Sequence, residues 1–471
     1  MANRRSSVTS IAITTLAVLL SCALHAVEFS VGAAAVKITP PQGTPLAGFY
    51  AMRPSTGVLD DIYSKAMVIE QDGAKVAIVS LDMCYTTRPI ILNARKLIAE
   101  KTGIPAERVL ISATHTHTGP ALERQATIDE LTGARTPAAV QYAASLPALI
   151  AQSVIEANEK RAPARAHAAI EREENLSFNR RFVMKDGTFG WNIPKSSANN
   201  VLRPSGPIDP DVGVLYIETS ANPARPIATY VNFAMHPVTV GGTKISSDYP
   251  HFLCKRLAEH KGPEMITLFA NGCCGNIGHR DISSPDAQSG VRESDRIGSR
   301  LAAAVQRAYE RMTPLQAFAP RVATQMVSLP LRKFTEQQAE KARAVVLRMS
   351  DPKLSTTVKA EAFCVLDVLA REGKPLEVEI QAIALSDELA IVALPGEIFV
   401  ELGLELKKSS PFKYTLIAEL ANGSIGYIPN RAAFPEGNYE VVSARTEEGS
   451  GELLIETALK LLKDLRAPAP K

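Results

Sequence analysis

The 471-residue sequence predicts an α/β fold with mixed β-sheets flanked by helices, in a single large domain. Short apolar runs of strand length alternate with longer segments whose apolar residues recur every three or four positions, as in amphipathic helices. Several connections between strand-like runs are too short to hold a helix, which favours antiparallel neighbours beside parallel ones. Hydrophobic residues make up 46% of the chain, enough for a sizeable core, and no internal repeat or low-complexity linker divides it.

The predicted elements begin with a hairpin. Residues 64–70 and 75–82 are strand-like and flank a turn at 71–73, and residues 90–99 follow with a helical period. Further strands are expected where short apolar runs stand alone, over residues 109–113, 165–171, 213–218, 227–235, 265–270, 376–385 and 389–394. Further helices are expected where the apolar period is near 3.6, over residues 138–160, 250–258, 291–312, 336–349, 398–407 and 451–465.

The first residues of the chain have the order of a secretory signal. Arg4 and Arg5 precede an apolar run over residues 11–24, which is short for a membrane span and close to the amino terminus. We therefore expect residues 1–26 to direct export, so that the protein is periplasmic or secreted.

Two kinds of processing fit this segment. Cleavage after Ala26 would leave one folded domain over residues 27–465 and a tail over 466–471. Residues 19–22 also resemble a bacterial lipobox, in which Cys22 would be lipidated and kept as the first mature residue, so anchoring through Cys22 stays the alternative.

The charge balance excludes nucleic acid as a partner. The chain has 52 Lys and Arg against 49 Asp and Glu, a formal charge of +3, which is too balanced for a nucleic-acid-binding surface. No later segment has about eighteen uninterrupted apolar residues, so no further membrane span is expected, and association would be limited to the membrane surface.

A pair of histidines follows the strand expected over residues 109–113. His115 and His117 stand at i and i+2, a spacing that lets both imidazoles of an extended chain face one pocket. Neutral imidazole is a common zinc ligand, and the chain has only eight histidines. The alternative is that both are polar strand-end residues hydrogen-bonded to backbone.

Two further strand ends carry potential ligands. His236 follows the strand expected over residues 227–235, and Glu397 follows the one over 389–394 after a Pro-Gly turn. Sites in open α/β sheets collect beyond the carboxyl ends of strands. Two histidines and one glutamate form a ligand set that catalytic zinc uses, with one position left for water, so His115, His236 and Glu397 predict a zinc site.

Four segments in this order resemble the catalytic domain of the neutral/alkaline non-lysosomal ceramidases. They are Thr114 to Pro120, Phe233 to His236, Leu394 to Glu397 and Gly426 to Ile428. The resemblance implies the ceramidase-type fold for the catalytic domain over 27–465, an N-acyl or lipid-like small-molecule substrate, and one Zn²⁺. It implies as metal ligands His115, His236, Glu397 and Tyr427. It implies as further active-site residues His117, Arg180 and Tyr439, with Tyr427 also catalytic.

One position departs from the family pattern. Where ceramidases read Gly-Asp-x-Ser-Pro-Asn, with a serine implicated in catalysis, this chain has Gly278 in place of the serine. We therefore expect zinc-bound water to be the nucleophile. The thiols of Cys273 and Cys274 follow the strand over residues 265–270 and are the other candidates, but we expect them to be buried and inert because nothing in the sequence lowers their pKa.

The remaining cysteines give little further information. Five remain apart from Cys22, an odd number for an exported protein, so at least one thiol is expected to be free.

The predicted constellation favours hydrolysis of an amide. Zinc lowers the pKa of its bound water toward neutrality, Tyr427 would donate to the developing oxyanion, Arg180 would add positive charge and His117 would carry the proton. The alternatives are a core aromatic for Tyr427, a surface cation for Arg180 and an orienting residue for His117. Four other polar residues have a structural role as the alternative to one in the site: Asn271, Asn276, His279 and Asp248. Asn276 and His279 could shape a substrate pocket, and Asp248 could be a helix N-cap.

Three functions compete on the sequence alone. The first is an exported zinc-dependent hydrolase of an N-acyl bond. The second is a metal-dependent phosphoesterase, which would need several Asp ligands that the motifs here do not offer. The third is a binding protein that keeps the zinc cleft without turnover.

Overall fold

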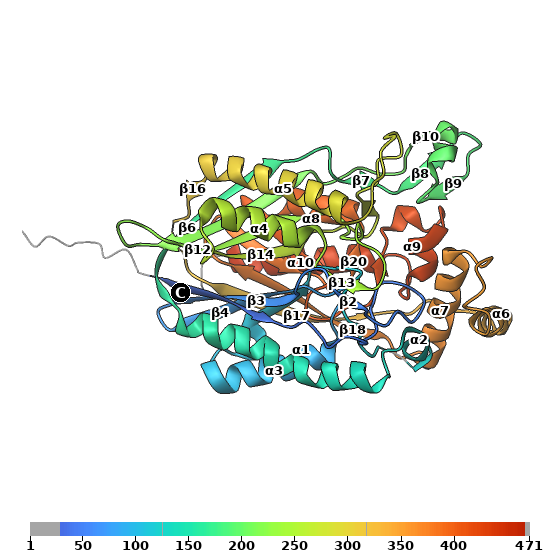
Figure 1. Ribbon diagram of the computed structural model, residues 1–471, viewed down its shortest axis with the longest axis horizontal. Coiled ribbons are helices and arrows are strands. Elements are labelled where there is room, and N and C mark those ends of the chain that lie inside the picture. The colour runs from blue at the N-terminus through green and yellow to red at the C-terminus, as the bar shows by residue number, and fades with distance from the viewer. Residues whose placement is uncertain (1–28, 125, 317, 467–471) are drawn as a thin grey trace, which may run out of the picture.

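The computed structural model describes residues 29–124, 126–316 and 318–466 (Figure 1). The expected signal over residues 1–26, with Cys22, lies outside the described residues, as does the tail after Arg466. The boundaries of the predicted domain therefore stay a prediction.

A large mixed sheet forms the centre of the described chain. Its order is β14-β12-β11-β6-β1-β3-β4-β5, with β16 paired to β6, nine strands in the described residues. The pairs β4–β5 and β12–β14 are parallel and the others antiparallel. The strands are β1 (Ser30–Lys37), β3 (Tyr63–Gln71), β4 (Ala74–Leu81), β5 (Val109–Ala113), β6 (Ala162–Arg172), β11 (Asp211–Thr219), β12 (Pro226–Phe233), β14 (Ile266–Asn271) and β16 (Thr313–Pro314).

A four-stranded sheet packs on the inner face of the large one. It has the order β17-β18-β19-β21, in which β19 and β21 are parallel. Apolar residues of both sheets, such as Met67 and Leu215 against Ile383 and Ile391, form one fully buried cluster. The strands are β17 (Arg321–Leu329), β18 (Leu376–Ala384), β19 (Leu389–Ala393) and β21 (Tyr414–Ala418).

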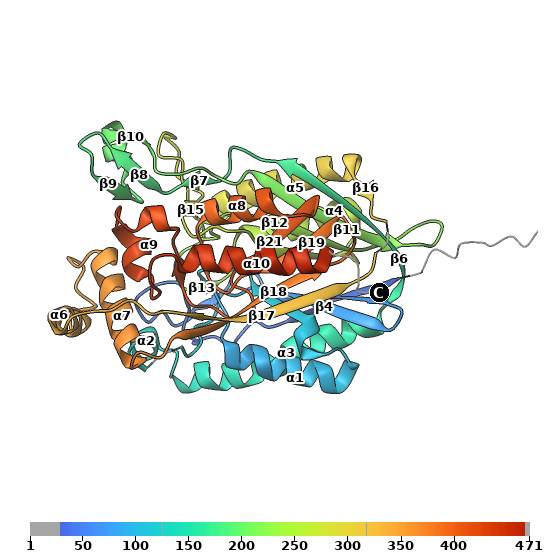
Figure 2. The ribbon, with the colours of Figure 1, turned by 180° about the vertical axis from the view of Figure 1, so that it is seen from behind.

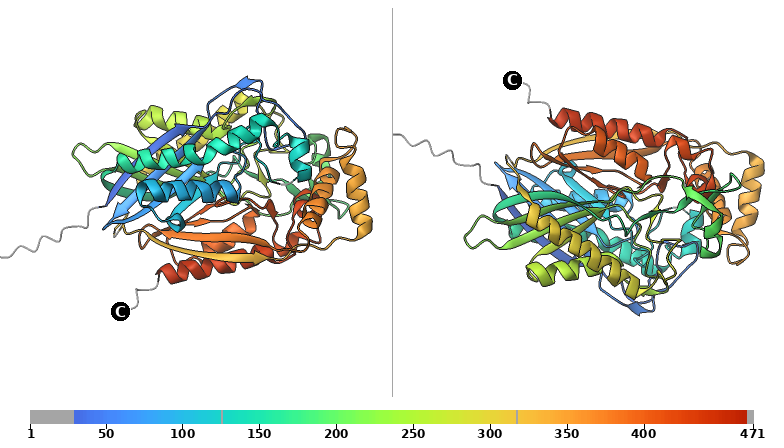
Figure 3. Two further views of the ribbon diagram at one scale, coloured as in Figure 1. Left: turned by 90° about the horizontal axis from the view of Figure 1, so that it is seen from below. Right: turned by 90° about the horizontal axis from the view of Figure 1, so that it is seen from above.

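Helices cover the outer faces of both sheets (Figures 1 and 2). On the large sheet, α1 (Arg88–Thr102) and α3 (Pro137–Glu159) cover one half, and α4 (Tyr249–Lys261) and α5 (Val291–Arg311) cover the other. On the small sheet lie α8 (Val400–Ser409) and α10 (Ser450–Arg466). Figure 3 shows the orange strands of the small sheet between the red helix α10 and the blue strands of the large sheet.

One helix of the described chain, α3, is long and apolar enough to cross a membrane by length and composition. Leu146, Ile150 and Val154 on one face are fully buried against α1, β1 and β3. This spacing of three to four residues is that of a helix packed on a sheet.

Short elements gather at one end of the molecule, at the right in Figure 1. The connection between β17 and β18 contains α6 (Glu336–Val346) and α7 (Thr356–Ala370), which pack on each other, and α7 also contacts α2 (Ala126–Thr132) and α9 (Asn438–Ser443). The small strands are β2 (Gly57–Val58), β7 (Phe178–Asn179), β8 (Arg181–Met184), β9 (Phe189–Trp191), β10 (Val201–Pro204), β13 (Lys244–Ile245), β15 (Ile277–Gly278), β20 (Glu397–Ile398) and β22 (Tyr427–Ile428).

The predicted fold class is confirmed, with helices flanking two mixed sheets. The hairpin expected at residues 64–82 is β3 and β4, which pair from Ser64↔Leu81 to Gln71↔Ala74. The helix expected over 398–407 begins two residues later, at Val400, because Glu397 and Ile398 pair with β22 instead.

The large sheet is curled, so that its edge strands β5 and β14 contact each other. Residues 419–422, which follow β21, join both edges. The amide of Glu419 donates to the carbonyl oxygen of Asn271 at 3.0 Å, and the amide of Asn422 donates to that of Ile111 at 2.8 Å. The carboxyl ends of β5, β12 and β19 therefore meet in one place.

Candidate active site

Three strand ends place their side chains around one point. His115 follows β5, His236 follows β12 and Glu397 follows β19, and one ligand atom from each lies within 4.8 Å of the others. Oε2 of Glu397 is 3.3 Å from Nε2 of His115 and 3.3 Å from Nε2 of His236. In tetrahedral zinc sites, ligands at roughly 2.0–2.2 Å from the ion lie about 3.3–3.5 Å apart, which these distances match.

The other ring nitrogen of each histidine is held by backbone. Nδ1 of His115 is 2.7 Å from the carbonyl oxygen of Cys84, and Nδ1 of His236 is 2.8 Å from that of Cys274. A carbonyl oxygen can only accept, so Nδ1 carries the proton in both rings and Nε2 keeps its lone pair. This is the arrangement found around metal-bound histidines, and the donor set fits a zinc ion.

The backbone at His115 is strained. Its φ is 77°, a left-handed conformation that is uncommon outside glycine. The amide of His115 donates to the carbonyl oxygen of Met83 at 2.8 Å, which holds the turn in place. Strain of this kind concentrates at functional sites.

A second group of potential ligands overlaps the first. It consists of Cys84, His115 and His117. Sγ of Cys84 lies 3.8 Å from Nδ1 of His115, the nitrogen that already donates to the backbone. The chemistry of the rings therefore favours the group with His236 and Glu397.

Tyr427 reaches the same point from β22. Its hydroxyl oxygen is 3.4 Å from Nε2 of His236 and accepts a hydrogen bond from Nη2 of Arg180 at 3.1 Å. Burial raises the pKa of Tyr427 well above its ordinary value, and the carboxylate of Glu397 acts in the same direction. The phenol therefore keeps its proton.

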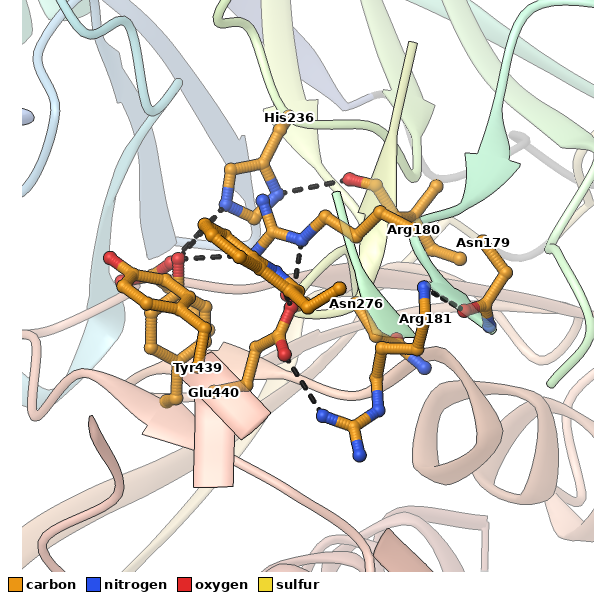
Figure 4. Close-up of polar contacts among 12 residues, drawn as sticks. Asn179, Arg180, Arg181, His236, Asn276, Tyr439 and Glu440 are labelled. Carbon is orange, nitrogen blue, oxygen red and sulfur yellow. Dashed lines mark hydrogen bonds and ion pairs between the residues drawn. The ribbon is translucent and has the colours of Figure 1, made fainter. Parts of the chain in front are cut away.

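Arg180 is buried in a network of charged groups (Figure 4). Its Nε donates to Glu440 at 2.9 Å, and Arg181 donates to the other oxygen of Glu440 at 3.0 Å. Nε1 of Trp191 donates to Glu440 at 2.7 Å. The alternative of a surface cation for Arg180 is wrong, because the side chain is only 9% exposed.

Tyr439 closes one side of the site. Its ring stacks on Trp191, with ring centroids 4.2 Å apart, and its hydroxyl lies 3.2 Å from that of Tyr50. Its ring also meets that of Tyr427 edge to face. These contacts place Tyr439 beside Tyr427 and outside the group formed by His115, His236 and Glu397.

His117 is close to the predicted ligands and lacks their backbone restraint. Its Nε2 is 3.4 Å from Nε2 of His115. Its Nδ1 is buried without a hydrogen-bond partner among the described residues. Burial lowers the pKa of His117 well below its usual value, helped by the positive charge that His115 carries when protonated. The ring is therefore neutral at pH 7.

The predicted ligands also have shifted pKa values. Burial, with the nearby Arg180, lowers the pKa of His236 to about 3. Burial opposes the charge on Glu397 and on His115, but each holds the other in its charged form, so the pKa of Glu397 is lowered and that of His115 is raised. A histidine must be neutral to bind a metal ion, so binding of a cation here would displace the proton from Nε2 of His115.

The adjacent residues Cys273 and Cys274 are both buried. Every cysteine in the described residues is a free thiol. Sγ of Cys274 donates to Glu419 at 2.9 Å, and burial raises the pKa of Cys273 and of Cys274 well above the usual range. These surroundings disfavour a thiolate, as the sequence predicts.

Glu419 and Glu440 are buried carboxyl groups beside the site that the sequence does not single out. Glu419 is fully buried and accepts from the amide of Cys274 at 3.1 Å and from that of Ile398 at 2.9 Å. It therefore holds the segment whose carbonyl group, at Cys274, contacts His236 and the segment that carries Glu397. Only Glu440 has a sequence signal, because it adjoins Tyr439.

The loop that contains Gly278, where the family pattern has serine, lies beside Arg180. A Cβ on Gly278 would meet only Cδ of Arg180, at 3.9 Å. Asn276 accepts from the amide of Val400 at 2.9 Å and supports the start of α8. His279 is held by the carbonyl oxygen of Gln288 at 2.8 Å. Asn276 and His279 are therefore structural in this loop.

Asp248 and Asn271 are also structural. Asp248 is the N-cap of α4, as expected, because its carboxylate accepts from the amide of Tyr249 at 2.7 Å. Asn271 accepts from the amide of Met235, next to His236, at 3.2 Å.

A cavity of about 90 Å³ opens onto these groups. His115, His117, Glu397, Tyr427 and Tyr439 line it. The structure thus brings the predicted site residues together, Arg180 through its bond to Tyr427, while their individual roles stay predictions.

Comparisons with known proteins bear on the family and the fold of this chain. The sequence profile described as "Neutral/alkaline non-lysosomal ceramidase, N-terminal" matches residues 29–361. Glu397, Tyr427 and Tyr439 lie beyond that match. A comparison with curated protein sequences finds no match.

Two solved structures share the fold. The crystal structure of neutral ceramidase from Pseudomonas aeruginosa is 18% identical with a TM-score of 0.72, and the alignment covers 94% of this chain and 77% of that one. A structure described as ceramidase complexed with C2 is 17% identical with a TM-score of 0.71 and the same coverage, 94% and 77%. Since the family profile spans well over half of the sequence, the protein belongs to the neutral/alkaline non-lysosomal ceramidase family.

Proposed function

We propose that this ceramidase-family hydrolase is a zinc-dependent enzyme that cleaves an N-acyl (amide) bond with water as the nucleophile. The observation that carries the proposal is the convergence of Nε2 of His115, Nε2 of His236 and Oε2 of Glu397, while both Nδ1 atoms are held by backbone carbonyl groups. Family membership supports the amide as the bond that is cleaved.

His115, His236 and Glu397 would hold the zinc, with Tyr427 as the remaining protein ligand. When bound, zinc polarises a substrate carbonyl and lowers the pKa of a coordinated water toward neutrality. Gly278 has no side-chain nucleophile, and burial keeps the thiols of Cys273 and Cys274 protonated, so neither competes with water.

Tyr427 and Arg180 are placed to stabilise developing negative charge. Because Arg180 donates to the hydroxyl oxygen of Tyr427, the proton of that hydroxyl is free to be donated in turn. A substrate carbonyl oxygen beside it would receive this hydrogen bond as it becomes an oxyanion. The Glu440 carboxylate keeps Arg180 in position from the other side.

His117 is the residue that we assign to proton transfer. Its neutral ring can accept the proton that water loses as the new C–O bond forms, and can pass it to the amide nitrogen as the C–N bond breaks. The products are a carboxylate and an amine, and no group on the protein is consumed.

Metal analysis combined with a substrate panel tests the proposal. The panel contains N-acyl lipids, N-acyl amino acids, simple esters and phosphate esters. We expect one zinc per chain and cleavage of amides that stops when a chelator removes the metal. Hydrolysis of phosphate esters alone would indicate a phosphoesterase, and zinc without turnover would indicate a binding protein.

We also propose that the protein is exported. The order of Arg4, Arg5 and the apolar run over residues 11–24 supports this, although the segment lies outside the described residues. Cell fractionation should find the chain outside the cytoplasm without its first residues. A Cys22→Ser variant of unchanged mass and location would show that no lipid is attached, and cytoplasmic chain beginning at Met1 would refute export.

A further inference from the structure

The cavity at the site is small. Its volume of about 90 Å³ compares with roughly 300–1,000 Å³ for pockets that enclose drug-sized ligands. Phe363 of α7 and Tyr50 line it, and their rings stack with centroids 5.0 Å apart. This volume favours a short acyl group over a long one between these walls.

A larger cavity adjoins the first. Its volume is about 420 Å³, and Arg124, Ser424 and Arg445 line both cavities. A molecule whose amide lies at His115 and Glu397 would therefore extend past Arg124 into the larger space.

The arginines that line the two cavities are ion-paired, with one exception. Arg445 and Arg371 both pair with Asp367, and Arg88 pairs with Glu379. Near these walls, Arg95 also pairs with Glu379, and Arg135 pairs with Glu123. The carboxylate of Glu377 lines the larger cavity as well. Arg124 has no carboxylate within ion-pair distance among the described residues.

The guanidinium of Arg124 is nevertheless held in place. Its central carbon lies 3.7 Å from the centroid of the Tyr85 ring, a cation–π contact. The hydroxyl of Tyr85 donates to the carbonyl oxygen of Leu122 at 2.9 Å, so the ring is fixed and buried. The planar donors of Arg124 are thus available at the junction of the two cavities. Glu397 is the one acidic residue that lines the smaller cavity.

We propose that the site takes a short-chain N-acyl amino acid, with the short acyl group in the small cavity and the substrate carboxylate bound by Arg124. The inference rests on the proposed amide hydrolase for its orientation, because the amide must lie at the predicted zinc ligands. It assigns Arg124 as the residue that determines specificity for an anionic substrate over a neutral lipid.

Two probes that cannot be hydrolysed test the assignment without turnover. Methylsulfonyl-leucine carries a carboxylate, and methylsulfonyl-leucinamide is its neutral counterpart. Calorimetry on the mature protein as isolated should show that the acid binds about tenfold or more tightly than the amide, as expected for a charge-assisted pair.

Three variants accompany the measurement. Arg124→Gln should abolish the preference for the acid, and Arg124→Lys should keep part of it, because the charge remains without the bidentate fork. Arg88→Ala removes the same charge from the wall of the larger cavity, where it is already paired, and should leave the preference unchanged. Circular dichroism checks that each variant is folded.

Equal binding of the two probes, or a preference that survives in Arg124→Gln, would overturn the assignment. So would tighter binding of a long-chain ceramide than of either probe. The outcome is independent of the proposed reaction: if the preference depends on Arg124 but no amide is cleaved, the hydrolase proposal fails and the anion site stands. If N-acetyl-leucine and its amide are cleaved equally well, the hydrolase proposal stands and the anion site at Arg124 fails.

Discussion

Glu397 and Tyr427 are partners in register across the parallel pair of β20 and β22. The amide of Glu397 donates to the carbonyl oxygen of Gly426 at 2.9 Å, so backbone hydrogen bonds hold the two residues side by side. A carboxylate and a phenol that are far apart in the sequence therefore reach the same point with little freedom. Their separate contributions can be measured by changing one side chain at a time.

Removing the hydroxyl group of Tyr427 should slow turnover. We expect Tyr427→Phe to lower kcat by roughly a hundredfold, the usual loss when an oxyanion donor is removed. Tyr230→Phe removes another buried phenol in the core and should leave kcat unchanged. Zinc content is measured on both, because loss of zinc in Tyr427→Phe would show that Tyr427 is a ligand.

Replacing a predicted ligand should remove the metal. His115→Ala and His236→Ala are expected to lose bound zinc in elemental analysis, because each deletes one of three converging donor atoms. Glu397→Gln should keep more zinc than activity, since the amide still offers an oxygen without the charge. His260→Ala, an exposed histidine of α4, is the control. Unchanged zinc in the first two variants would refute the site.

The adjacent thiols should be dispensable for chemistry. We expect Cys273→Ala and Cys274→Ala to keep most of their activity, because burial disfavours both thiolates. Mass spectrometry of protein quenched during turnover should show no acyl group on either cysteine. Loss of activity with zinc intact, or an acyl adduct, would mean that a thiol is the nucleophile.

The buried carboxyl of Glu419 predicts a pH dependence of stability. Burial raises the pKa of Glu419 to about 8 from its usual 4.5, so the folded chain binds more protons than the unfolded chain between these values. Its contribution to the free energy of unfolding is fully present below pH 4.5 and is lost as the pH rises through about 8.

Urea unfolding at several pH values measures this contribution. The free energy of unfolding of the natural chain, relative to that of Glu419→Gln, should fall steadily from pH 5 to above pH 8. A chelator is present, because a bound cation would lower the pKa of Glu419. A difference that stays constant across this range would show that Glu419 does not titrate in it.

Restoring the family serine should be structurally tolerated. Gly278→Ser adds a Cβ that meets only Arg180, so the free energy of unfolding should change by less than about 1 kcal/mol. Gly275→Ser is the contrasting variant in the same loop, because its Cβ would lie 2.5 Å from the carbonyl oxygen of Glu397 and must displace it.

Substrate tests on Gly278→Ser add a second expectation. We expect no gain of long-chain ceramide hydrolysis, because the cavity of about 90 Å³ is unchanged. Efficient ceramide cleavage by this variant would show that the cavity opens for long chains.

The positions of the predicted ligands could be inferred from sequence because each directly follows an apolar strand. His115, His236 and Glu397 need only the rule that strand ends meet at one edge of a sheet. Glu419 and Arg124 could not be found in this way. The role of Glu419 depends on contacts with the distant residues Cys274 and Ile398, and local sequence contains no signal for such contacts.

The fold shows the same limit. Periodicity predicts the long helices and buried strands, but it does not predict α7, which has apolar residues on more than one face. Its burial against α6 and α9 and its place beside the site follow from tertiary packing alone.

The connection that carries α6 and α7 joins two strands, β17 and β18, that are antiparallel neighbours along their whole length. A short turn would satisfy their pairing equally well, and lengthening such a connection costs little free energy. One wall of the cavity is therefore encoded separately from the predicted metal ligands. Exchange of this single segment between relatives would alter which acyl groups enter, while the hydrolytic centre and both sheets remain as they are.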